Sequence, residues 1–135
     1  MGVDAVVYLV GERLSQNFVG FLEEALEREV GNKRRQRVSL EETFKDERVL
    51  YNIDVDYTRA WAPYYRRGNW PLILKTIRTL QRHCPEHLVV YSNDLSYGVD
   101  PADIKVVTDE YISECTEAWN DMFPDEKIGT DGRTL

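Results

Sequence analysis

The chain has 135 residues, of which 42% are hydrophobic and 30% are charged, and its formal net charge is -7. This length suits one domain that buries a core without a metal or a disulfide, and no window approaches the roughly 18 consecutive apolar residues of a membrane-spanning helix. We therefore expect one soluble domain. Its N-terminal apolar run predicts a strand instead of a signal peptide, because no basic segment precedes it.

The charge is unevenly distributed along the sequence. Residues 86–135 contain twelve acidic and three basic side chains, whereas residues 1–85 contain twelve acidic and fourteen basic ones. A negative field repels nucleic acid and membrane phosphates and favours a basic protein partner. We therefore expect a protein partner, no nucleic acid and no membrane. Cys84 and Cys115 lack metal-type spacing, which predicts buried thiols in a reducing cytoplasm.

The first third of the chain predicts a strand followed by a helix. Residues 6–10 are a short apolar run typical of a buried strand. Ser15 is placed to cap a helix that ends at Gly31. Apolar residues at helical spacing predict the inner face of this helix: Phe18, Phe21, Leu22, Ala25, Leu26 and Val30.

The next residues predict a hairpin, in which the sequence K-D-E-R at 45–48 forms the turn between two antiparallel strands. The second strand, 49–57, alternates apolar residues with Asn52, Asp54 and Asp56, so we expect one buried face and one face that carries carboxylates. In the first strand we expect three apolar residues to share a face: Val38, Leu40 and Phe44.

A second helix is predicted to start after Asn69, which is placed as its N-cap and is followed by Pro71 in the first turn. Pro85 ends this helix, and residues 88–91 and 104–107 predict two further strands. The inward stripe of the helix is expected to contain six residues: Trp70, Ile73, Leu74, Ile77, Leu80 and Cys84.

A third helix is predicted to follow Thr108, which is placed as its N-cap, and to end at Phe123. Residues 124–135 lack periodicity, so we expect one domain over residues 1–123 and a flexible C-terminal tail. Five residues of the helix are expected to face inward: Tyr111, Cys115, Ala118, Trp119 and Met122.

The order of these elements predicts an α/β fold of the α+β type. Its form is a two-layer sandwich, in which helices pack on one face of a mostly antiparallel sheet of about five strands. The other face of the sheet would then be solvated or would serve as a docking surface.

Three aspartates could hold a hard cation. Asp54 and Asp56 flank a valine on one strand, and Asp94 follows another strand, so their oxygens could bind a metal such as magnesium. The alternative function is therefore a small metal-dependent hydrolase or nuclease. Aspartates that alternate on a solvated strand are also common as ordinary surface residues, which makes this the second choice.

Other signatures of catalysis are weak in this sequence. His83, Cys84 and His87 lie close together, but a zinc site needs about four ligands and the chain has no second Cys/His pair. No serine or cysteine lies in a nucleophile elbow, and no glycine-rich phosphate loop is present. We therefore expect no cofactor and no catalytic residue.

Aromatic and arginine residues are concentrated between the strand at 49–57 and the second helix. Tyrosine, tryptophan and arginine are enriched at binding hot spots, so these residues are candidates for partner binding. Trp70 is an exception, because it starts the inward stripe of the second helix and is expected in the core. The predicted partner-binding residues come from this loop, from strand ends and from the acidic third helix: Tyr64, Tyr65, Arg66, Arg67, Asp54, Asp56, Asp94, Tyr97, Asp109, Glu110, Glu114 and Glu117.

A single acidic α/β domain without catalytic residues and with an aromatic, charged surface resembles the immunity proteins that bacteria encode beside toxins. The stretches Y-Y-R-R-G-N-W-P at 64–71 and V-V-Y-S-N-D at 89–94 are also similar to segments of small bacterial proteins. The resemblance implies tight, stoichiometric binding that covers the active site of a toxin. We expect a non-catalytic monomer or homodimer whose partner is a cognate toxin or another enzyme with a basic surface.

Overall fold

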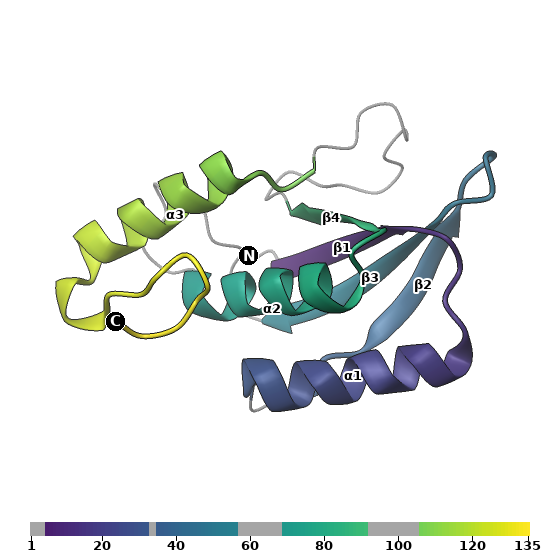
Figure 1. The fold of residues 1–135 in the computed structure, drawn as a ribbon, viewed down its shortest axis with the longest axis horizontal. Helices are drawn as coiled ribbons and strands as arrows, with labels where there is room; N and C mark the ends of the chain where they lie inside the picture. The colour runs from purple at the N-terminus through teal and green to yellow at the C-terminus, as the bar shows by residue number, and fades with distance from the viewer. Residues whose placement is uncertain (1–4, 33–34, 57–68, 92–105) are drawn as a thin grey trace.

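The computed structural model describes residues 5–32, 35–56, 69–91 and 106–135 (Figure 1). Within these ranges the chain forms three α-helices and a four-stranded antiparallel sheet, and the helices pack on one face of the sheet. The predicted two-layer α+β fold is therefore confirmed, with four strands where about five were expected. In the same ranges, no helix is long and apolar enough to cross a membrane.

The sheet has the strand order β2-β3-β1-β4, with every neighbouring pair antiparallel. Leu9 of the central strand β1 lies opposite Tyr51 of β3 on one side and Val89 of β4 on the other. All three of these residues belong to the main core. The strands are β1 (Ala5–Gly11), β2 (Val38–Thr43), β3 (Val49–Asp56) and β4 (Leu88–Tyr91).

Each predicted helix begins directly after the residue that was expected to cap it. The side chains of Ser15, Asn69 and Thr108 each accept a hydrogen bond from a backbone N–H in the first turn. Gly31, with a φ of 69°, ends the first helix in the left-handed region, as expected. The helices are α1 (Gln16–Val30), α2 (Trp70–His83) and α3 (Asp109–Met122), and a short 3-10 helix, η2 (Pro124–Glu126), follows.

Trp70 joins α2 to α3 and to the sheet. Its side chain is fully buried, which confirms the prediction that it belongs to the core. The ring centroid lies 6.3 Å from those of Tyr91 in β4 and Tyr111 in α3. The indole Nε1–H donates a hydrogen bond to Oγ1 of Thr116, at 3.0 Å. This buried contact positions α3 relative to the first turn of α2.

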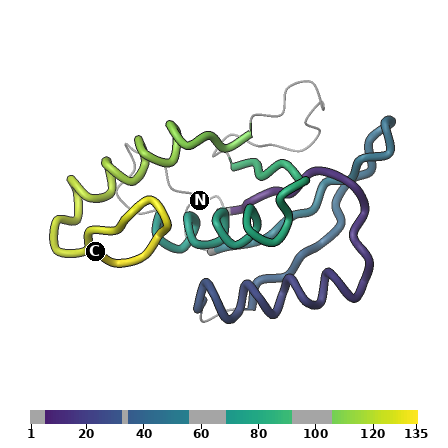
Figure 2. The backbone as a smooth tube through the Cα atoms, in the orientation of Figure 1, coloured from purple at the N-terminus to yellow at the C-terminus, as the bar shows by residue number. Residues whose placement is uncertain are grey.

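The face of the sheet turned away from the helices carries a small second core, where a solvated or docking face was expected. Val10, Leu50 and Val90 are buried there together with Phe44. Phe44 lies at the start of the hairpin turn, which extends beyond the ends of α1 and α2 in the view of Figure 2. This part of the face is therefore closed to solvent.

The expectation that Val38, Leu40 and Phe44 share one face is wrong. Val38 belongs to the main core, Phe44 to the second core, and Leu40 is 45% exposed. The register between β2 and β3 shifts between Leu40 and Glu42, and such a bulge changes which face the following side chains occupy.

Of the predicted strand 104–107, the structure describes the last two residues. Val106 makes an isolated antiparallel bridge with Val90, and the backbone N–H of Val107 donates to the carbonyl of Val89, at 2.9 Å. These contacts place the start of α3 beside the β4 edge of the sheet.

Residues 124–135 form a packed turn, in contrast to the expected tail. Ile128 is 4% exposed and belongs to the main core. Its backbone N–H and carbonyl both bond to the side-chain amide of Asn120, each at 2.9 Å, and it bridges Thr134. Figure 2 shows this segment returning past α3 to lie beside α2. Sequence periodicity missed the segment because its order comes from side-chain-to-backbone bonds and one buried residue.

Candidate functional site

The outer face of α3 carries a row of carboxylates that we call the acidic stripe: Glu110, Glu114, Glu117 and Asp121. Their spacing of four, three and four residues places them along one side of the helix. All four are exposed, and none forms an ion pair with another described residue. Asp121 was not among the predicted site residues. The fourth predicted carboxylate of this helix, Asp109, lies 3.5 Å from Nη1 of Arg78 and its side chain is 90% exposed.

The opposite side of α3 is anchored in the core. Ile112, Cys115 and Thr116 are buried there, and the ring of Trp119 lies 4.2 Å from that of Phe123. The indole N–H of Trp119 donates to the carbonyl of Glu126, at 3.1 Å. The acidic stripe is therefore presented on a helix whose orientation is set by buried contacts.

The helix itself gains little from these charges. Carboxylates in the first turn interact favourably with the helix dipole, which accounts for Asp109 and Glu110. Glu117 and Asp121 lie toward the other end, where the last turn contains no basic residue. Like charges three or four residues apart destabilise a helix by about 0.2–0.5 kcal/mol per pair. The stripe therefore costs some stability, which a cationic partner would offset.

Tyr111 lies on the inward side of the same helix and is not a candidate proton acceptor. Burial raises the pKa of its hydroxyl, and the adjoining Cys115 thiol and Glu114 carboxylate raise it further. The phenol therefore stays neutral and acts as a packing residue beside Trp70.

The structure separates Asp54, the other predicted aspartate whose side chain is described, from the stripe. Asp54 is exposed on β3, but its neighbours Ile53 and Val55 point into the main core beneath the helices. Because side chains alternate along a strand, Asp54 lies on the opposite face of the sheet. Asp54 and the acidic stripe therefore do not form one surface.

The remaining predicted site residues cannot be placed in this arrangement. Asp56 is the last residue of β3, and its side chain lies outside the described part of the structure. Among the residues that are described, no group of three or more His, Cys, Asp or Glu side chains could hold a metal ion. The residues of the aromatic loop and the next connection also lie outside the described ranges: Tyr64, Tyr65, Arg66, Arg67, Asp94 and Tyr97.

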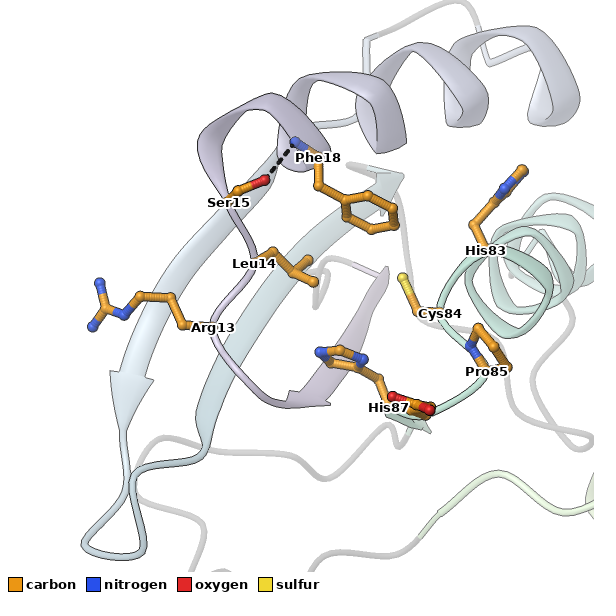
Figure 3. A pocket seen from close by; sticks show the side chains of 9 residues that line it. Arg13, Leu14, Ser15, Phe18, His83, Cys84, Pro85 and His87 are labelled. Carbon is orange, nitrogen blue, oxygen red and sulfur yellow. Dashed lines mark hydrogen bonds between the residues drawn. The ribbon is translucent and has the colours of Figure 1, made fainter.

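A hollow of about 410 Å³ lies where the connection from β1 to α1 meets the end of α2 (Figure 3). The side chain of Cys84 points from the end of α2 toward Phe18 and Leu14. The lining is Arg13, Leu14, Ser15, Phe18, His83, Cys84, Pro85, Glu86 and His87.

The two histidines that border this hollow are engaged with separate partners, and the thiol between them is buried. Nε2 of His83 lies 2.6 Å from a carboxylate oxygen of Glu29, and Nε2 of His87 lies 2.8 Å from the backbone carbonyl of Glu12. Cys84 is 3% exposed. The arrangement does not bring the two imidazoles and the thiol onto one point, so it offers no zinc site.

The thiol of Cys84 is also a poor nucleophile, because burial raises its pKa from the ordinary value of 9.0 to about 11. The unfolded chain would ionise first, so this thiol lowers the stability of the fold as the pH rises from 9.0 to about 11. Since thiolate is the reactive form, we expect Cys84 in the native protein to alkylate at least about 100-fold more slowly at about pH 8 than in the unfolded chain.

Alkylation with iodoacetamide, followed by peptide mass spectrometry, measures this rate for each cysteine separately. The same protein in denaturant is the control. Equal rates for native and denatured Cys84 would show that the hollow admits the reagent to an ionisable thiol, which contradicts the prediction.

A second charged surface, which is basic, was not predicted from the sequence. Lys75, Arg78 and Arg82 follow one another along α2 at spacings of three and four residues, which places them on one side of the helix. That spacing was visible in the sequence. The spacing alone did not reveal a basic surface, because the other basic residues on this surface come from α1 and from the C-terminal turn.

The chain was compared with protein-family models, with curated proteins and with solved structures, and none of the three comparisons produced a match.

Proposed function

We propose that this chain is a non-catalytic binding protein that uses the acidic stripe of α3 to hold and neutralise an enzyme with a basic surface. The resemblance to immunity proteins implies tight, stoichiometric binding that covers the active site of a toxin, which agrees with this proposal. The observation that carries the proposal is the row of Glu110, Glu114, Glu117 and Asp121, exposed on an anchored helix and without an ion pair among the described residues.

Two further features support this proposal. The stripe belongs to a helix that is fixed by buried contacts, so little conformational freedom is lost when a partner docks. A row of one sign also steers an oppositely charged partner and raises its association rate. Both properties suit a protein that must capture an enzyme quickly and hold it in one orientation.

Reversal of two charges in the stripe, Glu114→Lys with Glu117→Lys, should weaken the complex at least about 10-fold, or about 1.4 kcal/mol. The loss should come mainly from slower association and should shrink at high salt. Tagged wild-type protein and the variant are used to capture partners from host lysate. The captured protein is then purified, titrated by calorimetry for stoichiometry and assayed for enzymatic activity with and without the bound chain.

A matched control lies on α1, where Glu24→Lys with Glu27→Lys changes the same residue type at the same spacing on an exposed helix face. The control should capture the same partner with unchanged affinity. The proposal fails if the α3 variant binds as tightly as the wild type, or if the captured enzyme remains fully active in a saturated complex.

A further inference from the structure

A basic groove of about 650 Å³ lies between α1, α2 and the C-terminal turn. In Figure 1, α1 and α2 run side by side and the C-terminal segment lies against α2. The groove is lined by Arg28 and Glu29 from α1, by Lys75, Arg78, Thr79 and Arg82 from α2, and by Asp131 and Arg133 from the turn. Five of these side chains are cationic and two are carboxylates, which leaves a surplus of three positive charges in a chain whose net charge is -7.

Internal ion pairs neutralise part of this charge. Arg82 pairs with one carboxylate oxygen of Glu29, and the other oxygen contacts Nε2 of His83. Arg133 has a loose contact with Asp131, at 3.9 Å, and its side chain is 79% exposed. The two carboxylates of the groove are thus already engaged.

The remaining cations divide into one that supports the groove and two that have no counterion. Nε of Arg78 donates to the carbonyl of Thr130, at 2.9 Å, which ties the C-terminal turn to α2, and Nη1 of Arg78 lies 3.5 Å from the exposed carboxylate of Asp109. Arg28 and Lys75 form no ion pair with any residue that the structure describes. Two uncompensated cations therefore face a groove whose walls are already held together by a third.

We propose that this groove binds a small anion that carries two or more phosphate groups, held by Arg28 and Lys75. The inference concerns a different surface from the acidic stripe and does not depend on the proposed function. Two cations without a counterion among the described residues, Arg28 and Lys75, call for a multivalent anion, because a single carboxylate would neutralise one of them. Guanidinium groups match pairs of phosphate oxygens in geometry, and a lysine ammonium adds a mobile point charge.

The size of the groove agrees with this class of ligand. Sites for small ligands usually enclose about 300–1,000 Å³, and the groove falls within that range. A nucleic-acid strand would instead need a basic track beyond the groove, while the field of the whole chain repels it. The acidic stripe of a second copy has complementary charge and is the other competitor for the groove.

The experiment is a calorimetric titration of the full chain with inorganic triphosphate, pyrophosphate and monophosphate at low salt. Triphosphate should bind most tightly and monophosphate least. The double change Arg28→Gln with Lys75→Met should weaken triphosphate binding at least about 10-fold. Methionine keeps an aliphatic stem at Lys75, where the chain at Gly132 approaches closely, and so removes the charge without opening a gap.

The matched control is Arg37→Gln with Lys45→Met, which removes the same two residue types at exposed positions outside the groove. Both variants have the same net charge, so a general electrostatic effect would weaken them equally. Retained affinity in the control, with loss in the groove variant, supports the proposal. Absence of wild-type binding to triphosphate, or equal weakening of both variants, overturns it.

Two further outcomes would also overturn the proposal in favour of a competitor. Tighter binding of a short single-stranded RNA than of triphosphate would make the groove a nucleic-acid site. Light scattering that shows self-association, abolished both by the groove variant and by Glu114→Lys with Glu117→Lys, would assign the groove to a second copy of the chain.

Discussion

Replacement of Trp70 by alanine is expected to lower the free energy of unfolding by about 3–5 kcal/mol, as is typical when a large aromatic side chain is removed from a core. Trp70 is fully buried and contacts Tyr91 of β4 and Tyr111 of α3. Its loss would leave a cavity where α2, α3 and the sheet meet. Chemical denaturation followed by circular dichroism measures the change.

Milder variants separate packing from the hydrogen bond to Thr116. Trp70→Phe keeps most of the ring and removes the donor, and Thr116→Val removes the acceptor at nearly constant volume. Each variant should cost about 1–3 kcal/mol because a buried polar group or a small gap remains, and the double variant should cost less than the sum. Strict additivity would show that the bond contributes nothing to stability, and a stable Trp70→Ala protein would contradict the assignment of Trp70 to the core.

Replacement of Gly132 by alanine is the second change with a large expected effect. Gly132 has a φ of 86°, and a Cβ built there would lie 2.9 Å from Cγ of Lys75 and 3.2 Å from its backbone nitrogen. The left-handed backbone costs about 1–2 kcal/mol for a residue with a side chain, and overpacking adds about 1–3 kcal/mol. We therefore expect one of two results: the C-terminal turn detaches from α2, or the free energy of unfolding of the whole domain falls by about 2–5 kcal/mol.

Gly31→Ala is the matched control, because Gly31 also has a positive φ, of 69°, but among the described residues no side chain and no distant backbone atom lies within 4 Å of its added Cβ. The free energy of unfolding of Gly31→Ala should fall only by the cost of the left-handed backbone, without the cost of a steric clash. Denaturation of both variants, with hydrogen exchange at Ile128, separates global loss from local detachment of the turn. Equal destabilisation in the two variants would contradict a close approach of Gly132 to Lys75.

The two charged surfaces differ in how they depend on the fold. The acidic stripe lies within one helix, so its residues share a face as soon as α3 forms. The basic groove needs α1, α2 and the C-terminal turn to be assembled. The net charge predicted an acidic surface for a basic partner and argued against nucleic acid and membrane phosphates, but charges that are distant in sequence add locally when packing brings them together.

The sequence by itself determined the helices, their caps and most of their inward residues. Two assignments were wrong: Phe21, which was expected to face inward, is 45% exposed, and Ile112, which was not predicted, is fully buried. Ser15, Asn69 and Thr108 cap helices where predicted, because a capping side chain acts on a backbone N–H only two or three residues away. Helical periodicity likewise identified the buried side of α2, including Trp70. These signals are local, so they can be read without knowledge of distant contacts.

Only the tertiary structure decided what depends on residues distant in sequence. It placed Phe44 in a second core after a bulge in β2, and it packed Ile128 into the main core through contacts with Asn120. It also gathered cations from three segments, among them Arg28 and Lys75, into one groove. These features depend on which segments pack against one another: register shifts, side-chain-to-backbone hydrogen bonds and the sum of charges from different segments. Periodicity along the chain carries no information about such long-range contacts.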